Sequence, residues 1–66
     1  MSPSTCIGVI GLGLIGTSLA RRLLQAGFAV AGFDIAEERR ANLATLGGKA
    51  CDSAREVGEQ IGRAHV

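Results

Sequence analysis

Short apolar runs and amphipathic stretches alternate along the chain. The segments at residues 5–10 (TCIGVI) and 28–34 (FAVAGFD) are short and rich in apolar residues, as buried strands are. We expect a third, shorter strand at 49–51 (KAC). A stretch with helical spacing follows each of the three. This pattern predicts the order β-α-β-α-β-α with short connections, which is typical of a parallel sheet with right-handed crossovers.

The first expected helix follows a glycine-rich segment and ends at Gly27. Its apolar positions recur at helical spacing, with arginines and a glutamine between them. The positions predicted to face the core are Ile15, Leu19, Ala20, Leu23 and Leu24.

The other two expected helices carry signals at their ends. The second has Glu37 and Glu38 in its first turn and stops at residues 47–48, a pair of glycines. The third opens with Ser53 and carries Glu56 three residues later, which is the spacing of a capping box.

Three glycines with the spacing G-x-G-x-x-G join the first strand to the first helix. They are Gly11, Gly13 and Gly16, and the second strand ends in Asp34, 18 residues after the last of them. A dinucleotide-binding unit requires these parts in this order, with an acid about 20 residues after the glycines. Gly11 permits the tight turn, Gly13 lets a pyrophosphate approach, and Gly16 lets the helix pack closely. A plain structural turn is the alternative explanation.

The motif predicts which groups would contact the cofactor. The backbone N–H groups of Leu12 to Ile15 would face the pyrophosphate at the positive end of the helix. Asp34 would accept hydrogen bonds from the two ribose hydroxyls. A P-loop is excluded because no Gly-Lys-Ser/Thr is present. We therefore expect an α/β fold, the truncated first half of a Rossmann-type parallel sheet with strand order 3-2-1.

Composition narrows the choice of partners and compartment. The 66 residues carry a net charge of +1 and no Trp or Tyr, which predicts neither a nucleic-acid partner nor a membrane partner. Two cysteines and one histidine offer no metal site, so no metal is expected. The cysteines, Cys6 and Cys51, are predicted to be buried thiols too far apart for a disulfide, which favours a cytoplasmic location.

The segments IGVIGLGLIGTSLARRLLQAGFAVAGFD and LATLGGKACDSAREV together resemble the N-terminus of the β-hydroxyacid dehydrogenases. That family includes 3-hydroxyisobutyrate dehydrogenase and 6-phosphogluconate dehydrogenase. The resemblance implies hydride transfer between a nicotinamide cofactor and a small 3-hydroxyacid or semialdehyde, in a protein that is a homo-oligomer. The cofactor contacts that it implies are Gly11, Leu12, Gly13, Leu14, Ile15, Gly16, Asp34 and Ile35.

Two other interpretations stay open at this point. The segment GLGLIGTSLA is also similar to the glycine loop of prephenate and arogenate dehydrogenases. A non-enzymatic NAD-sensing module would carry the same loop. For any of them Asp34 favours NAD over NADP, because a carboxylate repels the 2′-phosphate and Ile35 donates nothing to it. Arg39 and Arg40 are predicted to lie on a solvated helix face, from which they would at most soften that preference without reversing it.

We expect the natural sequence to continue beyond Gln60. Residues 1–60 supply one half of a dinucleotide-binding domain, and the family's substrate-binding glycines and catalytic lysine belong to later segments. Residues 61–66 (IGRAHV) match one reading frame of a common sequencing adaptor and are predicted to be a non-native tail. No residue of this chain is therefore assigned a catalytic role.

Overall fold

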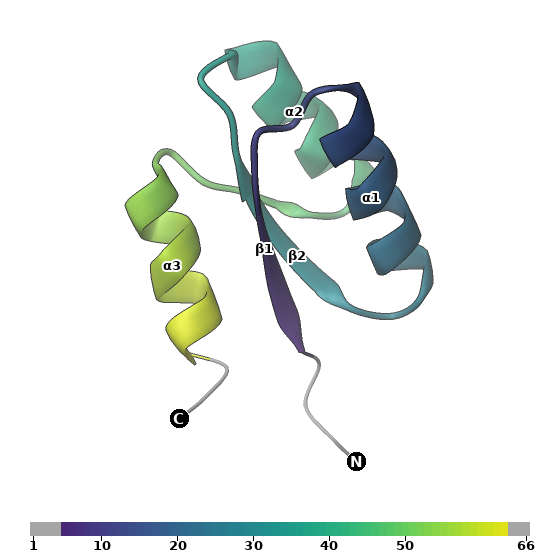
Figure 1. Ribbon diagram of the computed structural model, residues 1–66, viewed down its shortest axis with the longest axis vertical. Coiled ribbons are helices and arrows are strands. Elements are labelled where there is room, and N and C mark those ends of the chain that lie inside the picture. Colours follow the sequence, from purple (N-terminus) through teal and green to yellow (C-terminus); the bar gives the residue numbers. More distant parts are fainter. Residues whose placement is uncertain (1–4, 64–66) are drawn as a thin grey trace.

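A three-stranded parallel sheet lies at the centre of the computed structural model, which describes residues 5–63 (Figure 1). The strands are β1 (Cys6–Ile10), β2 (Ala29–Phe33) and β3 (Lys49–Ala50), in the spatial order β1-β2-β3. Cys6 lies opposite Ala29 in the first pairing, and Ala31 lies opposite Lys49 in the second. The predicted parallel sheet with order 3-2-1 is confirmed.

Helices cover both faces of this sheet. α1 (Leu14–Gln25) and α2 (Glu37–Leu46) lie on one side, and α3 (Ala54–Arg63) lies on the other (Figure 1). The alternation of side chains along a strand divides the core accordingly. Val30 joins the cluster under α1 and α2, and its neighbour Ala31 joins the cluster under α3. This is the start of a Rossmann-type fold, as the sequence predicts.

Two small apolar clusters form the core. The cluster under α1 and α2 contains Val9, Leu12, Ala20, Val30 and Leu43, with Leu23 and Leu24 packed against it. The cluster under α3 contains Ala31, Cys51 and Val57, with Cys6, Phe33 and Ile61 packed against it. Both cysteines are free thiols, and burial raises the pKa of the Cys51 thiol.

The predicted core face of α1 is only partly correct. Ala20 is fully buried and Leu23 and Leu24 contact the core, but Ile15 and Leu19 are 84% and 48% exposed. The glycine at position 16 explains the difference, because it lets the start of α1 approach the end of β1. The helix therefore faces the sheet with positions 16, 20, 23 and 24, and the stripe with Ile15 and Leu19 faces outward.

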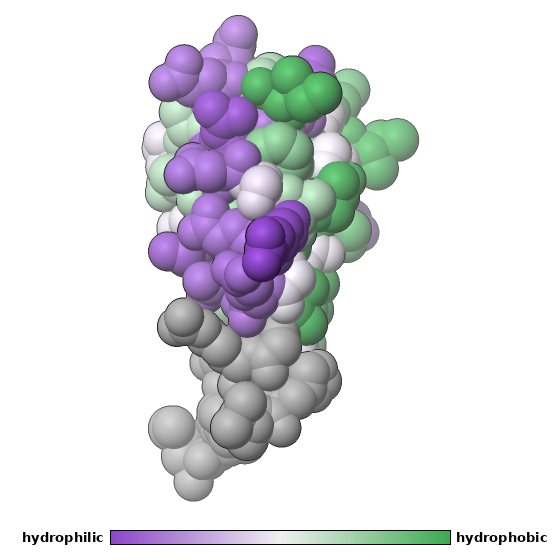
Figure 2. Space-filling view, turned by 90° about the vertical axis from the view of Figure 1, so that its left-hand side faces the viewer, coloured by the Kyte–Doolittle hydropathy of each residue, from purple (hydrophilic) through white to green (hydrophobic). Residues whose placement is uncertain are grey.

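Exposed apolar side chains gather beside the outer edge of β1. Among residues 5–63, no strand pairs with this edge, because β1 is hydrogen-bonded to β2 alone. The exposed residues are Ile10 at the end of β1 and Leu14, Ile15 and Leu19 of α1. Figure 2, which views the molecule from the side of α3, shows hydrophobic surface along one side and hydrophilic surface along the other. No helix within the described residues is long and apolar enough to span a membrane.

The start of α3 has the predicted cap. The Ser53 hydroxyl accepts the Glu56 N–H at 3.0 Å. The Glu56 carboxylate turns back and accepts the N–H of Asp52 at 2.8 Å, one residue before the one that a standard capping box uses. The helix supplies its own N-terminal partners here.

α3 continues to Arg63, three residues past the expected end of the native sequence. Ile61 packs against the cluster under this helix, and a side chain at Gly8 of β1 would collide with Ile61 and Val57. This packing does not test the adaptor origin of residues 61–66, which stays a prediction. Residues 64–66 lie outside the described residues.

Candidate functional site

The turn from β1 into α1 depends on two glycines. Gly11 adopts a positive φ of 90°, which side chains disfavour, and its N–H donates to the Phe33 carbonyl at 2.9 Å. A Cβ at Gly16 would collide with the carbonyl oxygen of Gly11. The Thr17 hydroxyl, which the sequence analysis did not identify, donates to the Leu12 carbonyl at 3.0 Å and fixes the turn from the helix side.

The third glycine leaves the start of α1 open. Gly13 is the N-cap residue in an extended conformation, and no side chain caps the helix there. The first turn of α1 also holds no acidic residue. A Cβ at Gly13 would meet only the Arg39 Nη1 atom, at 3.8 Å. Free backbone donors and the positive end of the helix dipole are therefore presented to a group that comes close to the backbone.

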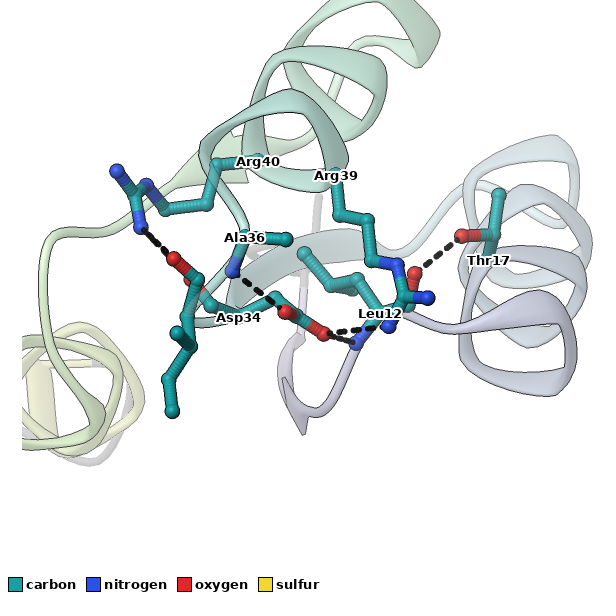
Figure 3. A network of polar contacts seen from close by, with 7 residues as sticks. Leu12, Thr17, Asp34, Ala36, Arg39 and Arg40 are labelled. Carbon is teal, nitrogen blue, oxygen red and sulfur yellow. Dashed lines mark hydrogen bonds and ion pairs between the residues drawn. The ribbon is translucent and has the colours of Figure 1, made fainter.

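Asp34 is held beside this turn by backbone donors. Its Oδ2 atom accepts the Leu12 N–H at 2.7 Å, and its Oδ1 atom accepts the Ala36 N–H at 2.8 Å (Figure 3). Arg39 Nη1 lies 3.6 Å from Oδ2, and the Asp34 side chain is 11% exposed. The bonds from Ala36 and Leu12, and then Arg39, lower the pKa of Asp34 against the opposing effect of burial. The carboxylate is ionised at neutral pH.

The two arginines of α2 point back to the same loop (Figure 3). Arg40 Nη1 donates to the carbonyls of Asp34 and Ile35, at 2.7 and 3.2 Å, and its guanidinium lies over the Phe33 ring. The expectation of a solvated helix face is therefore wrong for Arg40, which is fixed on the β2–α2 loop. It holds for Arg39, whose side chain is 53% exposed although it approaches Asp34. The position of both arginines early in α2 was the available signal, since the first turn of a helix lies over the loop that leads into it.

Two hollows flank Asp34. A hollow of about 270 Å³ is lined by Ile10, Gly11, Phe33, Asp34 and Ile35. The second hollow lies over the glycine turn and is lined by Val9, Ile10, Gly11, Gly13, Leu14, Ile15, Gly16, Leu19, Asp34 and Arg39. Among these lining residues, Asp34 and Arg39 are the ionisable ones. The arrangement suits binding of an extended ligand with an apolar part, and it offers no acid–base pair for chemistry.

Most of the predicted contact residues meet at these hollows. Gly11, Gly13, Leu14, Ile15, Gly16 and Asp34 line the second hollow, and Ile35, which is 89% exposed, lines the first. Leu12 differs, because its side chain is buried in the core and its N–H is taken by Asp34. Its role as a direct cofactor contact stays a prediction, as do those of the other residues.

The donors and acceptors at this site fit a dinucleotide. Each carboxylate oxygen has about two acceptor positions, and one on each oxygen of Asp34 is used by a backbone N–H. One position on each oxygen remains, which matches the two hydroxyls of a ribose. The open backbone above Gly13 and the uncapped start of α1 match a pyrophosphate.

Comparison with known proteins agrees with this geometry. Residues 6–66 match the family model for the NAD binding domain of 6-phosphogluconate dehydrogenase. The chain is 44% identical over 54 residues to L-threonate dehydrogenase from Cupriavidus necator, covering 82% of this chain and 18% of that protein. It is 38% identical over 56 residues to the NAD(+)-dependent, decarboxylating 6-phosphogluconate dehydrogenase of Haloferax volcanii, covering 85% of this chain and 19% of that protein.

A solved structure gives the same picture. The chain superimposes on an imine reductase from Pseudomonas sp. with a TM-score of 0.77 and 36% identity, over 83% of this chain and 19% of that one. The chain thus spans about a fifth of the length of the relatives that it matches. The predicted resemblance is confirmed: the chain belongs to the family of the 6-phosphogluconate dehydrogenase NAD-binding domain, and its relatives are β-hydroxyacid dehydrogenases.

Proposed function

We propose that this chain binds the adenosine and pyrophosphate part of NAD in a dehydrogenase. The parent protein would transfer hydride between NAD and a small 3-hydroxyacid or semialdehyde. The observation that carries the proposal is the juxtaposition of the uncapped start of α1 with the Asp34 carboxylate. The spacing, the backbone donors and the remaining acceptor positions at this junction suit one extended ligand.

Each part of the ligand would have its own partner. The ribose hydroxyls would donate to the two free acceptor positions of Asp34, and the pyrophosphate would lie over Gly13. The exposed Ile35 side chain and the apolar hollow beside it would receive the adenine ring. When bound, the nicotinamide supplies the hydride chemistry. The described residues bind and orient the cofactor and leave substrate chemistry to other segments of the parent protein.

A preference for NAD over NADP follows from the charge on Asp34. Its lowered pKa keeps the carboxylate ionised at neutral pH, where it repels a 2′-phosphate. Ile35 follows Asp34 directly and offers no side-chain donor to a phosphate. The Haloferax volcanii relative is an NAD(+)-dependent enzyme, which agrees with the proposal.

The test is cofactor affinity, measured by calorimetry on the natural full-length protein that carries these residues. We expect NAD to bind at least about tenfold more tightly than NADP, because the ribose hydrogen bonds to a charged group are lost with NADP. Asp34→Asn should lower the affinity for NAD by about 10- to 100-fold, and so reduce the difference between the affinities for NAD and NADP. Tighter binding of NADP than of NAD by the unsubstituted protein would contradict the cofactor assignment.

Turnover distinguishes a dehydrogenase from a sensing module. A panel of small 3-hydroxyacids and semialdehydes, assayed by NADH absorbance, should contain at least one substrate. Tight NAD binding without turnover of any member would favour the NAD-sensing interpretation. Failure to bind either dinucleotide would contradict the proposed function as a whole.

A further inference from the structure

Thr17 joins α1 to the glycine turn through two hydrogen bonds. Its backbone N–H donates to the Gly13 carbonyl at 2.8 Å. Its hydroxyl donates to the Leu12 carbonyl at 3.0 Å (Figure 3). A carbonyl oxygen only accepts, so the single proton of the hydroxyl is used in this bond. One residue of the helix thus holds two consecutive carbonyls of the turn.

The hydroxyl bond of Thr17 differs from the one that a helical threonine usually makes. Such a hydroxyl bonds the carbonyl three or four residues earlier, inside the helix. Thr45 of α2 does so, since its hydroxyl donates to the Ala41 carbonyl at 3.0 Å in an exposed position. Thr17 reaches five residues back in half-buried surroundings, to a residue that precedes the N-cap of α1. Its hydroxyl therefore joins the helix to the turn, whereas that of Thr45 joins a helix to itself.

Leu12 is also held from two other directions. Its side chain is buried in the cluster under α1 and α2, and its N–H donates to Asp34 Oδ2 at 2.7 Å. Among residues 5–63, the Thr17 hydroxyl is the one donor to the Leu12 carbonyl. The next residue, Gly13, has no Cβ, so the peptide group between them would rotate at little cost without that donor. The hydroxyl supplies the constraint that a glycine does not.

The two carbonyls that Thr17 holds fix the direction of two N–H groups. The peptide bonds of residues 5–63 are trans, and in a trans peptide group the C=O and N–H bonds point in opposite directions. The Leu12 carbonyl shares its peptide plane with the Gly13 N–H, and the Gly13 carbonyl shares its plane with the Leu14 N–H. Because both carbonyls are turned toward Thr17, both N–H groups point away from it, out of the open start of α1. A pyrophosphate over Gly13 would meet these donors.

We propose that Thr17 is a positioning residue for the cofactor, whose hydroxyl holds the Leu12–Gly13 peptide group so that the Gly13 N–H faces the pyrophosphate. This inference rests on the proposed function, because it concerns the phosphate part of the same site. The hydroxyl orients the donors before the ligand arrives and has no need to touch the ligand. Its loss should therefore reduce binding of the pyrophosphate and leave binding of the ribose at Asp34 intact.

The experiment compares Thr17→Val with Thr45→Val in the natural full-length protein. Each variant replaces a hydroxyl that donates to a backbone carbonyl at 3.0 Å by a methyl group of similar size. Calorimetry gives the affinity for NAD, and NMR titration gives the affinities for ADP and adenosine. We expect Thr17→Val to lower the affinities for NAD and ADP about tenfold, and the affinity for adenosine less than about twofold. Thr17→Ser keeps the hydroxyl and should restore both affinities, and Thr45→Val should leave all three unchanged.

The comparison of ADP with adenosine separates positioning of the donors from a general structural role. An equal loss of affinity for both ligands in Thr17→Val would overturn the proposal, as would NAD affinity within about twofold of the unsubstituted protein. The same holds if Thr17→Ser or Thr45→Val loses as much NAD affinity as Thr17→Val does. Thr17→Ala removes the same hydroxyl and gives the same comparison if Thr17→Val does not fold. Absence of NAD binding by the unsubstituted protein would overturn the proposed function, and the inference with it.

Discussion

The start of α1 and the start of α3 lie at the same edge of the sheet and differ in how their backbone donors are used. At α3, the Ser53 hydroxyl accepts the N–H of Glu56 in the first turn, and the Glu56 carboxylate accepts the N–H of Asp52. At α1, the N-cap is Gly13, without a side-chain partner or an acid in the first turn. Both helices follow parallel strands, so the fold alone does not require this difference.

The difference shows where the fold leaves room for a ligand. At a capped helix start, side chains of the protein already accept hydrogen bonds from the backbone N–H groups, and an acidic residue there repels an anion. An uncapped start with glycine at the N-cap gives up about a few tenths of a kcal/mol relative to Ser or Asp and keeps its donors for an anion. A capping side chain at Gly13 should therefore raise the stability of the protein and lower its affinity for an anion. Loss of the cap at Ser53 should lower the stability and leave the affinity unchanged.

The largest expected effect comes from making the start of α1 resemble that of α3. Gly13→Asp introduces an N-cap carboxylate at a residue whose φ of −72° suits a side chain. We expect the unfolding free energy to rise by up to about 1 kcal/mol and NAD affinity to fall at least about 100-fold, because the carboxylate repels the pyrophosphate. Thermal unfolding and calorimetry measure the two changes, and undiminished NAD binding would contradict the account.

Two glycine substitutions compare the stability of the tight turn before α1 with that of an ordinary position in helix α3. Gly16→Ala should destabilise the protein by about 1–3 kcal/mol, because the added methyl collides with the Gly11 carbonyl. Gly58→Ala in α3 meets no atom within 4 Å and should stabilise it by up to about 1 kcal/mol. Denaturant unfolding of both variants gives the comparison, and equal effects would show that α1 does not approach β1 as described.

Removal of the cap on α3 should affect stability alone. Ser53→Ala deletes the acceptor for the Glu56 N–H and should cost about 1 kcal/mol of unfolding free energy. NAD affinity should stay unchanged, because α3 starts at a separate point of the sheet edge. A parallel loss of NAD affinity in calorimetry would show that the two helix starts are not independent.

The smallest expected effect is the pH dependence that Asp34 contributes. Its pKa is lowered in the folded protein, mainly by the N–H groups of Ala36 and Leu12. The stabilisation is therefore complete above the ordinary aspartate pKa of about 3.9, and it is lost as the pH falls through the lowered folded value. The unfolding midpoints of the unsubstituted protein and Asp34→Asn should differ at neutral pH and converge in acid. A constant difference down to pH 2 would contradict this.

The sequence predicted the element order and the cap on α3, because each depends on local signals. The strand order was predictable from the alternation of strands and helices, since 3-2-1 is the usual order of dinucleotide-binding units. Strand length, glycine stops and the Ser53–Glu56 spacing all act over a few residues. The glycine turn was predictable as well, since its spacing and the distance to Asp34 are constraints along the chain. The cofactor contacts themselves remain predictions.

Long-range contacts were not predictable in the same way. Ile15 and Leu19 fit a helical apolar stripe, and the close approach at Gly16 turns that stripe outward. Arg40 was expected in solvent because charged residues on helices usually are, and only the folded loop brings the Asp34 carbonyl within its reach. Such side-chain to backbone contacts depend on the geometry of a turn, which residue types alone do not specify.

The open start of α1 is expected to bind the cofactor pyrophosphate, and the capped start of α3 is not. Backbone amide NMR of the natural full-length protein, titrated with NAD, tests this expectation directly. We expect large amide shifts for Gly13, Leu14 and Ile15, with the amides of Ala54 and Arg55 nearly unshifted. Saturable NAD binding that left the α1 amides unshifted, or shifted both helix starts equally, would contradict it.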